Sequence, residues 1–206
     1  MRIAEQIKQL SDQIQFGIVI GGGNFFRGSQ HSSQLGLDMR VGHSVGMLAT
    51  VMNGLIIQDV FKQAGLRSTL LSAVSSPVIG WPISQETIDR ALAKGAIPIF
   101  SGGVGAPYFS TDTAAIVRAL QIGAQEVWKA TNVDGIYAQD PVYNPQAPLI
   151  KKLSYAQALT DNIRIVDRTA LILAQEQNIR IRVFNAFASD ILIHAARDTH
   201  VGSTLL

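Results

Sequence analysis

The sequence lacks cysteine altogether, which excludes disulfide bonds and thiolate chemistry and fits a reducing compartment. Charged residues make up only 16% of it, the net charge is +2, and lysine and arginine nowhere cluster into a nucleic-acid surface. Its apolar runs are too short to span a bilayer, and Glu5 and Lys8 interrupt what would be the apolar segment of a signal peptide. We therefore expect a cytoplasmic protein that binds neither nucleic acid nor membrane.

The residues that are present fit a globular protein. Apolar residues make up 47% of the 206-residue chain, and a chain of this length can bury a substantial core. No internal repeat or linker divides the sequence. We therefore expect a single domain over residues 1–206.

Apolar periodicity predicts strands that alternate with helices. Strands are expected at residues 16–20, 68–74, 96–100, 126–131 and 179–185, with a last edge strand at 204–206. Helices are expected at residues 2–14, 40–63, 85–94, 113–122, 154–159, 167–177 and 189–196. Residues 29–38 are polar and predict a mobile loop, and residues 132–149 predict a turn-rich excursion. This alternation favours an α/β fold, a three-layer αβα sandwich with a mostly parallel sheet.

Two glycine-rich turns are the most informative segments. Gly21–Gly28 follows the first expected strand, and Ser101–Asp112 lies between an expected strand and an expected helix. In such turns bare N–H groups point outward, and the helix dipole favours negative charge. Both turns, and Thr131, stand at the carboxyl ends of strands, where parallel sheets bind their ligands. The sequence therefore predicts a nucleotide or phosphate site.

The first turn has two interpretations that the segment alone leaves evenly balanced. The N–H groups of Gly22 and Gly23 could contact phosphate oxygens, with Arg27 as a charged fork. Alternatively, the glycines only supply positive φ values. The spacing matches neither a Walker A loop nor a dinucleotide fingerprint. The histidines have no metal-ligand spacing, so no metal-binding residues are expected.

The other candidate segments also allow two interpretations each. Ser110 and Thr111 could donate hydroxyl groups to a phosphorylated substrate beside Asp112, or Thr111 or Asp112 could merely cap the helix. Residues 134–140 could clamp an adenine and ribose, with Tyr137 as an aromatic face. Taken alone, the Asp-Gly dipeptide in this segment favours a plain hairpin.

Six segments form a specific combination, although no single one of them is specific. They are residues 18–28 (IVIGGGNFFRG), 46–54 (GMLATVMNG), 103–112 (GVGAPYFSTD), 129–137 (KATNVDGIY), 181–185 (IRVFN) and 201–205 (VGSTL). In this order they resemble the bacterial uridylate kinase family, enzymes of the amino-acid-kinase fold that phosphorylate UMP with ATP. The resemblance spans nearly the whole chain.

The resemblance implies phosphoryl transfer from ATP to UMP, giving UDP for pyrimidine biosynthesis. Gly22 would contact the UMP phosphate, whereas Gly23 and Arg27 would face the ATP phosphates and the transferred group. The residues that would wrap UMP are Val104, Gly105, Ala106, Pro107, Tyr108, Phe109, Ser110 and Thr111.

The resemblance also implies the remaining parts of the site. Thr131, Tyr137 and Asp140 would hold the base and ribose of ATP. Arg27 would be catalytic together with Asp112, which would organise the charged centre. Mg²⁺ would bridge the phosphates. Members of the family are typically homohexamers regulated by GTP and UTP, which we carry over as expectations.

The chain departs from the family at several positions. The family opens with a strand ending in Lys-Leu-Ser-Gly, whose lysine neutralises the transferred phosphoryl group, and this chain begins after it, so we expect a fold lacking that first strand. His43 stands in the UMP-binding set where the family has an aspartate that accepts hydrogen bonds from the ribose. Val104 and Ala106 replace polar residues of the UMP loop. We therefore expect contacts with ATP to be kept better than contacts with UMP.

Three explanations stay open at this point. The given start is not the natural one and the protein is a complete kinase, or the chain is a kinase for a different small substrate. The third explanation is a diverged, non-catalytic paralogue that binds or stores a nucleotide or another phosphorylated ligand. A shifted start accounts for the missing strand but leaves His43, Val104 and Ala106 without an explanation.

Overall fold

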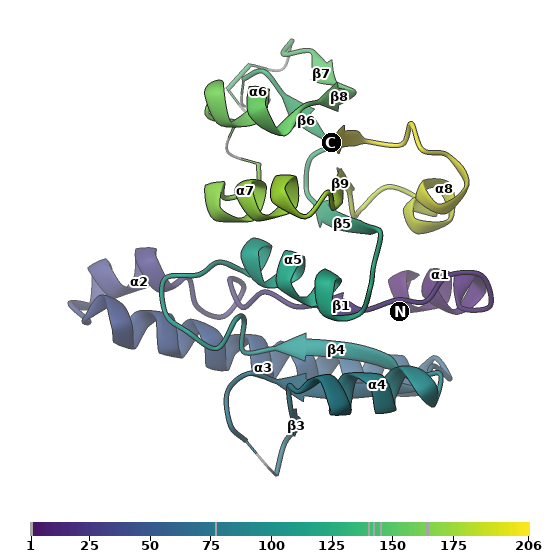
Figure 1. Cartoon of the computed structure of the whole chain (residues 1–206). Coiled ribbons are helices and arrows are strands. Elements are labelled where there is room, and N and C mark those ends of the chain that lie inside the picture. Colours follow the sequence, from purple (N-terminus) through teal and green to yellow (C-terminus); the bar gives the residue numbers. More distant parts are fainter. Residues whose placement is uncertain (1, 77, 140, 142, 145, 164) are drawn as a thin grey trace. The chain divides into compact units, whose positions relative to one another are not determined.

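The computed structural model describes residues 2–76, 78–139, 141, 143–144, 146–163 and 165–206. The chain forms two compact units, Met1–Ile122 and Gly123–Leu206, each with its own sheet and helices (Figure 1). Mostly parallel strands flanked by helices confirm the predicted α/β class. The expectation of one domain over residues 1–206 stays a prediction.

The sheet of the first unit is parallel throughout its described strands. Its order is β1-β4-β2-β3. The strands are β1 (Ile18–Val19), β4 (Ile97–Ser101), β2 (Ser68–Ser72) and β3 (Trp81–Pro82). The central strand β4 (IPIFS) is buried along its whole length and β2 (STLLS) is buried from Leu70 to Ser72, because each has another strand on both edges and helices over its faces.

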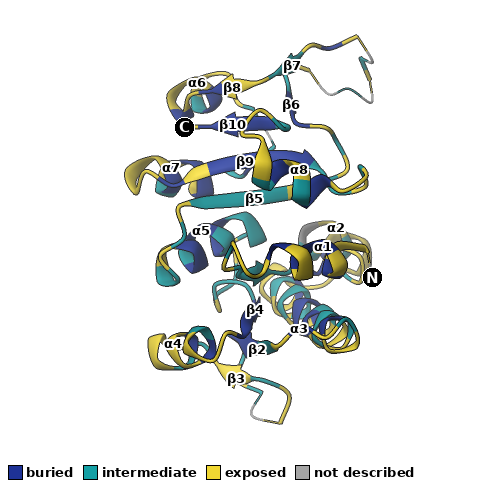
Figure 2. Ribbon diagram, turned by 90° about the vertical axis from the view of Figure 1, so that its right-hand side faces the viewer, coloured by how far each residue is buried: buried dark blue, intermediate teal, exposed yellow. Residues whose placement is uncertain are grey.

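The helices of the first unit cover both faces of this sheet. They are α1 (Arg2–Leu10), α2 (Gly28–Leu35), α3 (Met39–Gln63), α4 (Gln85–Ala93) and α5 (Thr111–Gln121). Figure 2 shows α3 and α4 on opposite sides of β2 and β4. Leu71, Ile88 and Phe100 form a core cluster between strand and helix.

Helix α2 corrects the prediction of a mobile loop at residues 29–38. The segment has no apolar periodicity because it packs against α3 through small residues. A Cβ at Gly42 would lie 1.6 Å from Oγ of Ser32, so only glycine lets the two helices approach this closely. Gly36, at φ 65°, ends the helix and donates its N–H to the carbonyl of Ser32.

Helix α3 is, among the described helices, the one long and apolar enough to cross a membrane by length and composition. A core helix of a folded domain meets the same criteria. Here the helix packs against β2 and β4 and buries Ala49, Val51 and Phe61. We therefore interpret α3 as a layer of the first unit.

The second unit has a mixed sheet of order β5-β9-β10-β8. The strands are β5 (Glu126–Thr131), β9 (Arg180–Asn185), β10 (Ser203–Leu205) and β8 (Lys152–Leu153), with a separate antiparallel pair β6 (Ile136–Tyr137) and β7 (Leu149–Ile150). The helices are α6 (Tyr155–Thr160), α7 (Arg168–Glu176) and α8 (Ile191–Arg197). Strand β10 lies antiparallel to β9 and parallel to β8, so the prediction of an edge strand there is wrong.

Tyr155 makes the stability of the second unit depend on pH in the alkaline range. Its side chain is 5% exposed, and its hydroxyl donates a hydrogen bond to the carbonyl of Ile179. Burial raises the pKa of Tyr155 from 10.0 to about 12. In the unfolded chain the phenol loses its proton first, so the stability it contributes is complete below about pH 10 and is lost as the pH rises towards 12.

Tyr155→Phe tests this expectation. At neutral pH the variant should lose about 1 kcal/mol of unfolding free energy, the contribution of one hydrogen bond. Between pH 10 and 12 the wild type should lose up to about 1.4 kcal/mol per pH unit relative to the variant. Urea unfolding at several pH values measures the difference, and a difference that does not change with pH would contradict the expectation.

Candidate functional site

The first glycine turn packs directly on α3. The carbonyl of Gly22 accepts hydrogen bonds from the N–H groups of Phe25 and Phe26, at 3.0 and 2.9 Å. A Cβ at Gly22 would lie 2.8 Å from the carbonyl oxygen of Gly46 and 2.9 Å from Cβ of Ala49. No positive φ occurs at Gly21, Gly22 or Gly23. Close approach to α3, not an unusual φ, therefore requires glycine at Gly22.

Arg27 presents an accessible positive charge at the end of this turn. Its Nε donates to the carbonyl of Gly23 at 3.3 Å, which fixes the side chain over the turn. The side chain is exposed, and no ion pair joins it to a carboxylate of the described residues. The terminal nitrogens of the guanidinium group therefore remain available for a phosphate.

Asn53 of α3 also holds the first turn, and sequence reasoning missed it. Its Nδ2 donates to the carbonyl of Gly21 at 2.7 Å and to Oδ1 of Asn24 at 2.6 Å. The available signal was an amide within the mostly apolar stretch 45–57 of this helix. Such a residue in a core helix usually has a specific partner, because a buried polar group without one is costly.

The second turn differs because its glycines do adopt left-handed conformations. The φ values of Gly102, Gly103 and Gly105 are 76°, 61° and 92°. The N–H of Gly102 donates to Oγ1 of Thr50 at 2.6 Å, which ties the turn to α3. Only glycine adopts such a run without strain, so the backbone of this turn is defined by its sequence.

The structure brings His43 of α3 together with the second turn. The rings of His43 and Tyr108 lie 5.0 Å apart. Tyr108 has φ 72°, a left-handed value that is uncommon for a residue with a side chain. Tyr108 and Phe109 are exposed, and Val104, Ala106 and Pro107 are half-buried. The side chains of this loop thus form an aromatic and apolar wall.

The two turns meet at the start of α5. A Cβ at Gly21 would lie 3.6 Å from Oγ1 of Thr111. Oγ of Ser110 accepts the N–H of Thr113 at 3.2 Å, so Ser110 is the cap and the interpretation of Thr111 or Asp112 as the cap is wrong. Thr111 and Asp112 lie in the first helical turn, half-buried, where the dipole favours an anion.

The residues predicted to hold the base and ribose of ATP belong to the second unit. Thr131 ends β5 and donates its hydroxyl to Oδ1 of Asn132 at 3.2 Å, and Tyr137 is half-buried in β6. Asp140 lies outside the described residues. Strand β6 pairs with β7, and Asp134 and Gly135 precede β6, so the interpretation of this segment as a plain hairpin turned by the Asp-Gly dipeptide is wrong.

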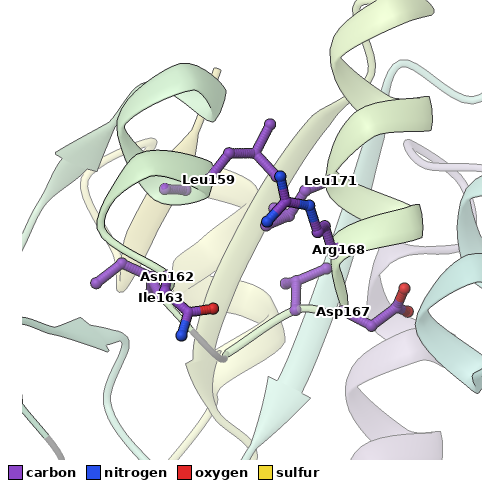
Figure 3. Close-up of a pocket in the computed structure, with 8 residues that line it drawn as sticks. Leu159, Asn162, Ile163, Asp167, Arg168 and Leu171 are labelled. Carbon is purple, nitrogen blue, oxygen red and sulfur yellow. The ribbon is translucent and has the colours of Figure 1, made fainter.

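A pocket of about 140 Å³ lies elsewhere in the second unit, between α6 and α7 (Figure 3). Asn162 and Ile163 line it from the connection between these helices, and Arg168 and Leu171 line it from α7. It is smaller than typical ligand sites of about 300–1,000 Å³ and includes none of the predicted site residues. The two glycine turns therefore remain the candidate site of the first unit.

Comparison with known proteins gives consistent matches over most of the chain. The model of the amino acid kinase family matches residues 1–185. A uridylate kinase of Methylococcus capsulatus is 38% identical over 206 residues, which cover 100% of this chain and 86% of that protein. A uridylate kinase of Colwellia psychrerythraea is 43% identical over 185 residues, covering 89% and 74%. The crystal structure of UMP kinase from Ureaplasma parvum superposes with a TM-score of 0.92 at 33% identity, covering 99% and 87%.

Proposed function

The chain belongs to the amino acid kinase family, and we propose that it transfers the terminal phosphoryl group of ATP to UMP, giving UDP. The observation that carries the proposal is the meeting of two glycine turns and a helix start in the first unit, with Arg27 fixed over one of them. Phosphoryl transfer needs positioning and charge neutralisation more than covalent help. The turns supply N–H groups for phosphate oxygens, and Arg27 supplies a cation.

We propose the following roles for the individual residues. We propose that Gly22 and the loop Val104–Thr111 bind UMP, with His43 and Tyr108 forming one wall. Gly23 and Arg27 would bind the phosphates of ATP, and Thr131, Tyr137 and Asp140 its base and ribose. Asp112 would orient the reacting groups from the first turn of α5.

Mg²⁺ fits this site as an ion carried by the substrate. No group of three or more histidine, aspartate or glutamate side chains that could hold a metal occurs in the described part of the chain. Mg²⁺ commonly uses one or two carboxylates together with substrate phosphates, and Asp112 is the carboxylate we propose here. When bound, the ion would neutralise charge on the phosphates.

A coupled ADP-release assay tests the proposal. ADP should form with ATP–Mg²⁺ and UMP at rates at least tenfold above those with other nucleoside monophosphates or small acids. Turnover with another acceptor alone would make the chain a kinase for a different substrate. Nucleotide binding without turnover would favour the non-catalytic paralogue, which the apolar Val104 and Ala106 in the acceptor loop make the second candidate.

We also propose that the protein is a cytoplasmic homo-oligomer, a hexamer by analogy with its family, that GTP and UTP regulate. An apolar stripe supports the assembly, because large apolar patches on a surface usually mark an interface. The stripe consists of the exposed α3 residues Val41, Leu48, Met52, Leu55 and Ile56. These positions recur at helical spacing, so they lie along one face of α3. A second copy of the chain is the occupant we propose for it.

Leu48→Glu is expected to dissociate the oligomer. A carboxylate in the middle of a dry interface has no partner there, so association should weaken by at least about a hundredfold. Light scattering over a concentration series should then give a smaller mass. Ala93→Glu on the exposed end of α4 adds the same charge away from the stripe and should leave the mass unchanged. Equal masses for the wild type and Leu48→Glu would contradict the proposed interface.

A further inference from the structure

Arg118 of α5 is a buried cation directly beneath the second glycine turn. It is 6% exposed, and its Nη2 donates to the carbonyl of Gly103 at 2.9 Å. Its Nη1 donates to Oε1 of Gln121 at 2.6 Å, and the guanidinium lies 5.8 Å from the ring centre of Phe100. No carboxylate of the described residues forms an ion pair with it.

Burying a charge that no described carboxylate pairs with costs free energy, so stability alone does not account for this placement. Burial lowers the pKa of the Arg118 guanidinium, because desolvation disfavours its charged form. Its Nε is buried without a hydrogen-bond partner. An apolar side chain of similar volume would fill the space without leaving a charge uncompensated. The contact that an apolar side chain would lose on the turn is the hydrogen bond to Gly103.

Thr50 holds the preceding peptide of the same turn from the opposite side. Its Oγ1 accepts the N–H of Gly102 at 2.6 Å and donates to the carbonyl of Met47 at 2.7 Å. Two successive glycines with positive φ are thus fixed by side chains from two helices, Thr50 of α3 and Arg118 of α5. Glycine has the greatest freedom of backbone conformation, so these two contacts restrict the second turn at its least constrained residues.

We propose that Arg118 is a positioning residue of the phosphoryl-transfer site, which holds Gly103 and places a buried positive charge beneath the turn that leads into the proposed UMP loop, residues 104–111. The proposal rests on the proposed function, because it assigns Arg118 to the acceptor half of that site. It predicts an effect on the acceptor that is larger than the effect on ATP, since the contact is to the acceptor turn alone. A role in stability only would lower both affinities together.

Arg118→Met and Arg118→Lys separate these roles. In Arg118→Met, which keeps the volume without charge or donor, the KM for UMP should rise about tenfold to thirtyfold, because the turn loses the charge-assisted hydrogen bond that holds Gly103. The KM for ATP should change less than twofold. Arg118→Lys keeps the charge and one donor and should recover part of the loss. Arg90→Met, which removes an exposed arginine from α4, is the matched control and should change neither KM.

Calorimetric titration with UMP makes the test independent of turnover. If the wild type binds UMP without turnover, the proposed function fails, and a tenfold weaker UMP affinity of Arg118→Met still supports the positioning role. Equal losses for UMP and ATP, or no loss for UMP, would overturn it, as would a wild type that binds no UMP. Thr50→Val keeps the volume of Thr50 and removes its contact with Gly102, so it should shift the UMP affinity in the same direction even where Arg118→Met fails to fold.

Discussion

Replacing Arg27 with alanine is expected to lower kcat for UDP formation by at least about a thousandfold. Loss of an arginine that stabilises charge on the transferred phosphoryl group costs about 10³–10⁵ in kcat. Nε of Arg27 donates to the carbonyl of Gly23 at 3.3 Å, so in the proposed site the guanidinium group would already be oriented before the transition state forms. The lost interaction strengthens as charge develops, so kcat should fall more than the KM for ATP rises.

Two variants sharpen this expectation. Arg27→Lys keeps a positive charge but loses the planar fork, and should recover about tenfold to a hundredfold of the lost rate. Arg90 of α4 is exposed and pairs with Glu86, so Arg90→Ala is the control and should leave kcat within twofold. Steady-state kinetics at saturating ATP–Mg²⁺ measure all three. A decrease in kcat of less than tenfold for Arg27→Ala would exclude Arg27 from the reacting centre.

Local sequence signals predicted most elements of the fold. Strand β5 has the predicted bounds, because the strand-favouring Val127, Trp128 and Thr131 stand directly before turn-forming residues. Helix α3 was predicted to within one residue from its long apolar periodicity. Helix α2 and the interior place of β10 could not be predicted in this way. The first depends on Ser32 packing beneath Gly42, and the second on pairing with strands far away in the sequence.

The candidate site was predicted through its glycines but not through the side chains that hold them. A glycine in a sequence does not say whether it serves close approach, as at Gly22, or a left-handed backbone, as at Gly103. Thr50 and Arg118 lie 52 and 15 residues from the peptides they bind, so no short motif connects them. Such contacts require the fold to be known first.

The partners of the two arginines of β9 could not be predicted from local sequence either. One of these arginines carries the second large expected effect, a loss of stability. Arg180 and Arg182 are two residues apart on the strand, so both side chains lie on the same face and both approach Glu126 of β5. Arg180 begins the strand and is exposed, whereas Arg182 is buried. Arg182 is 3% exposed and meets Glu126 of β5 through a bidentate pair, with Nη2 at 3.0 and 2.8 Å from its two carboxylate oxygens. Its Nη1 also donates to the carbonyls of Ala195, at 2.6 Å, and Asp198, at 3.1 Å. One side chain thus links two strands and α8.

Arg182→Met is therefore expected to destabilise the protein by about 3–5 kcal/mol, because it leaves the half-buried carboxylate of Glu126 and two carbonyls without their main partner. Arg180→Met is the matched control: its side chain is 53% exposed and 4.0 Å from Glu126, so it should cost less than about 1 kcal/mol. Adding Glu126→Leu to Arg182→Met should recover part of the loss, because the unpaired charge disappears. Urea unfolding followed by circular dichroism gives the free energies, and equal losses for Arg180→Met and Arg182→Met would contradict the buried role. Thr131, which we propose to bind ATP, ends the strand paired with β9, so ATP affinity should fall with Arg182→Met and stay unchanged with Arg180→Met.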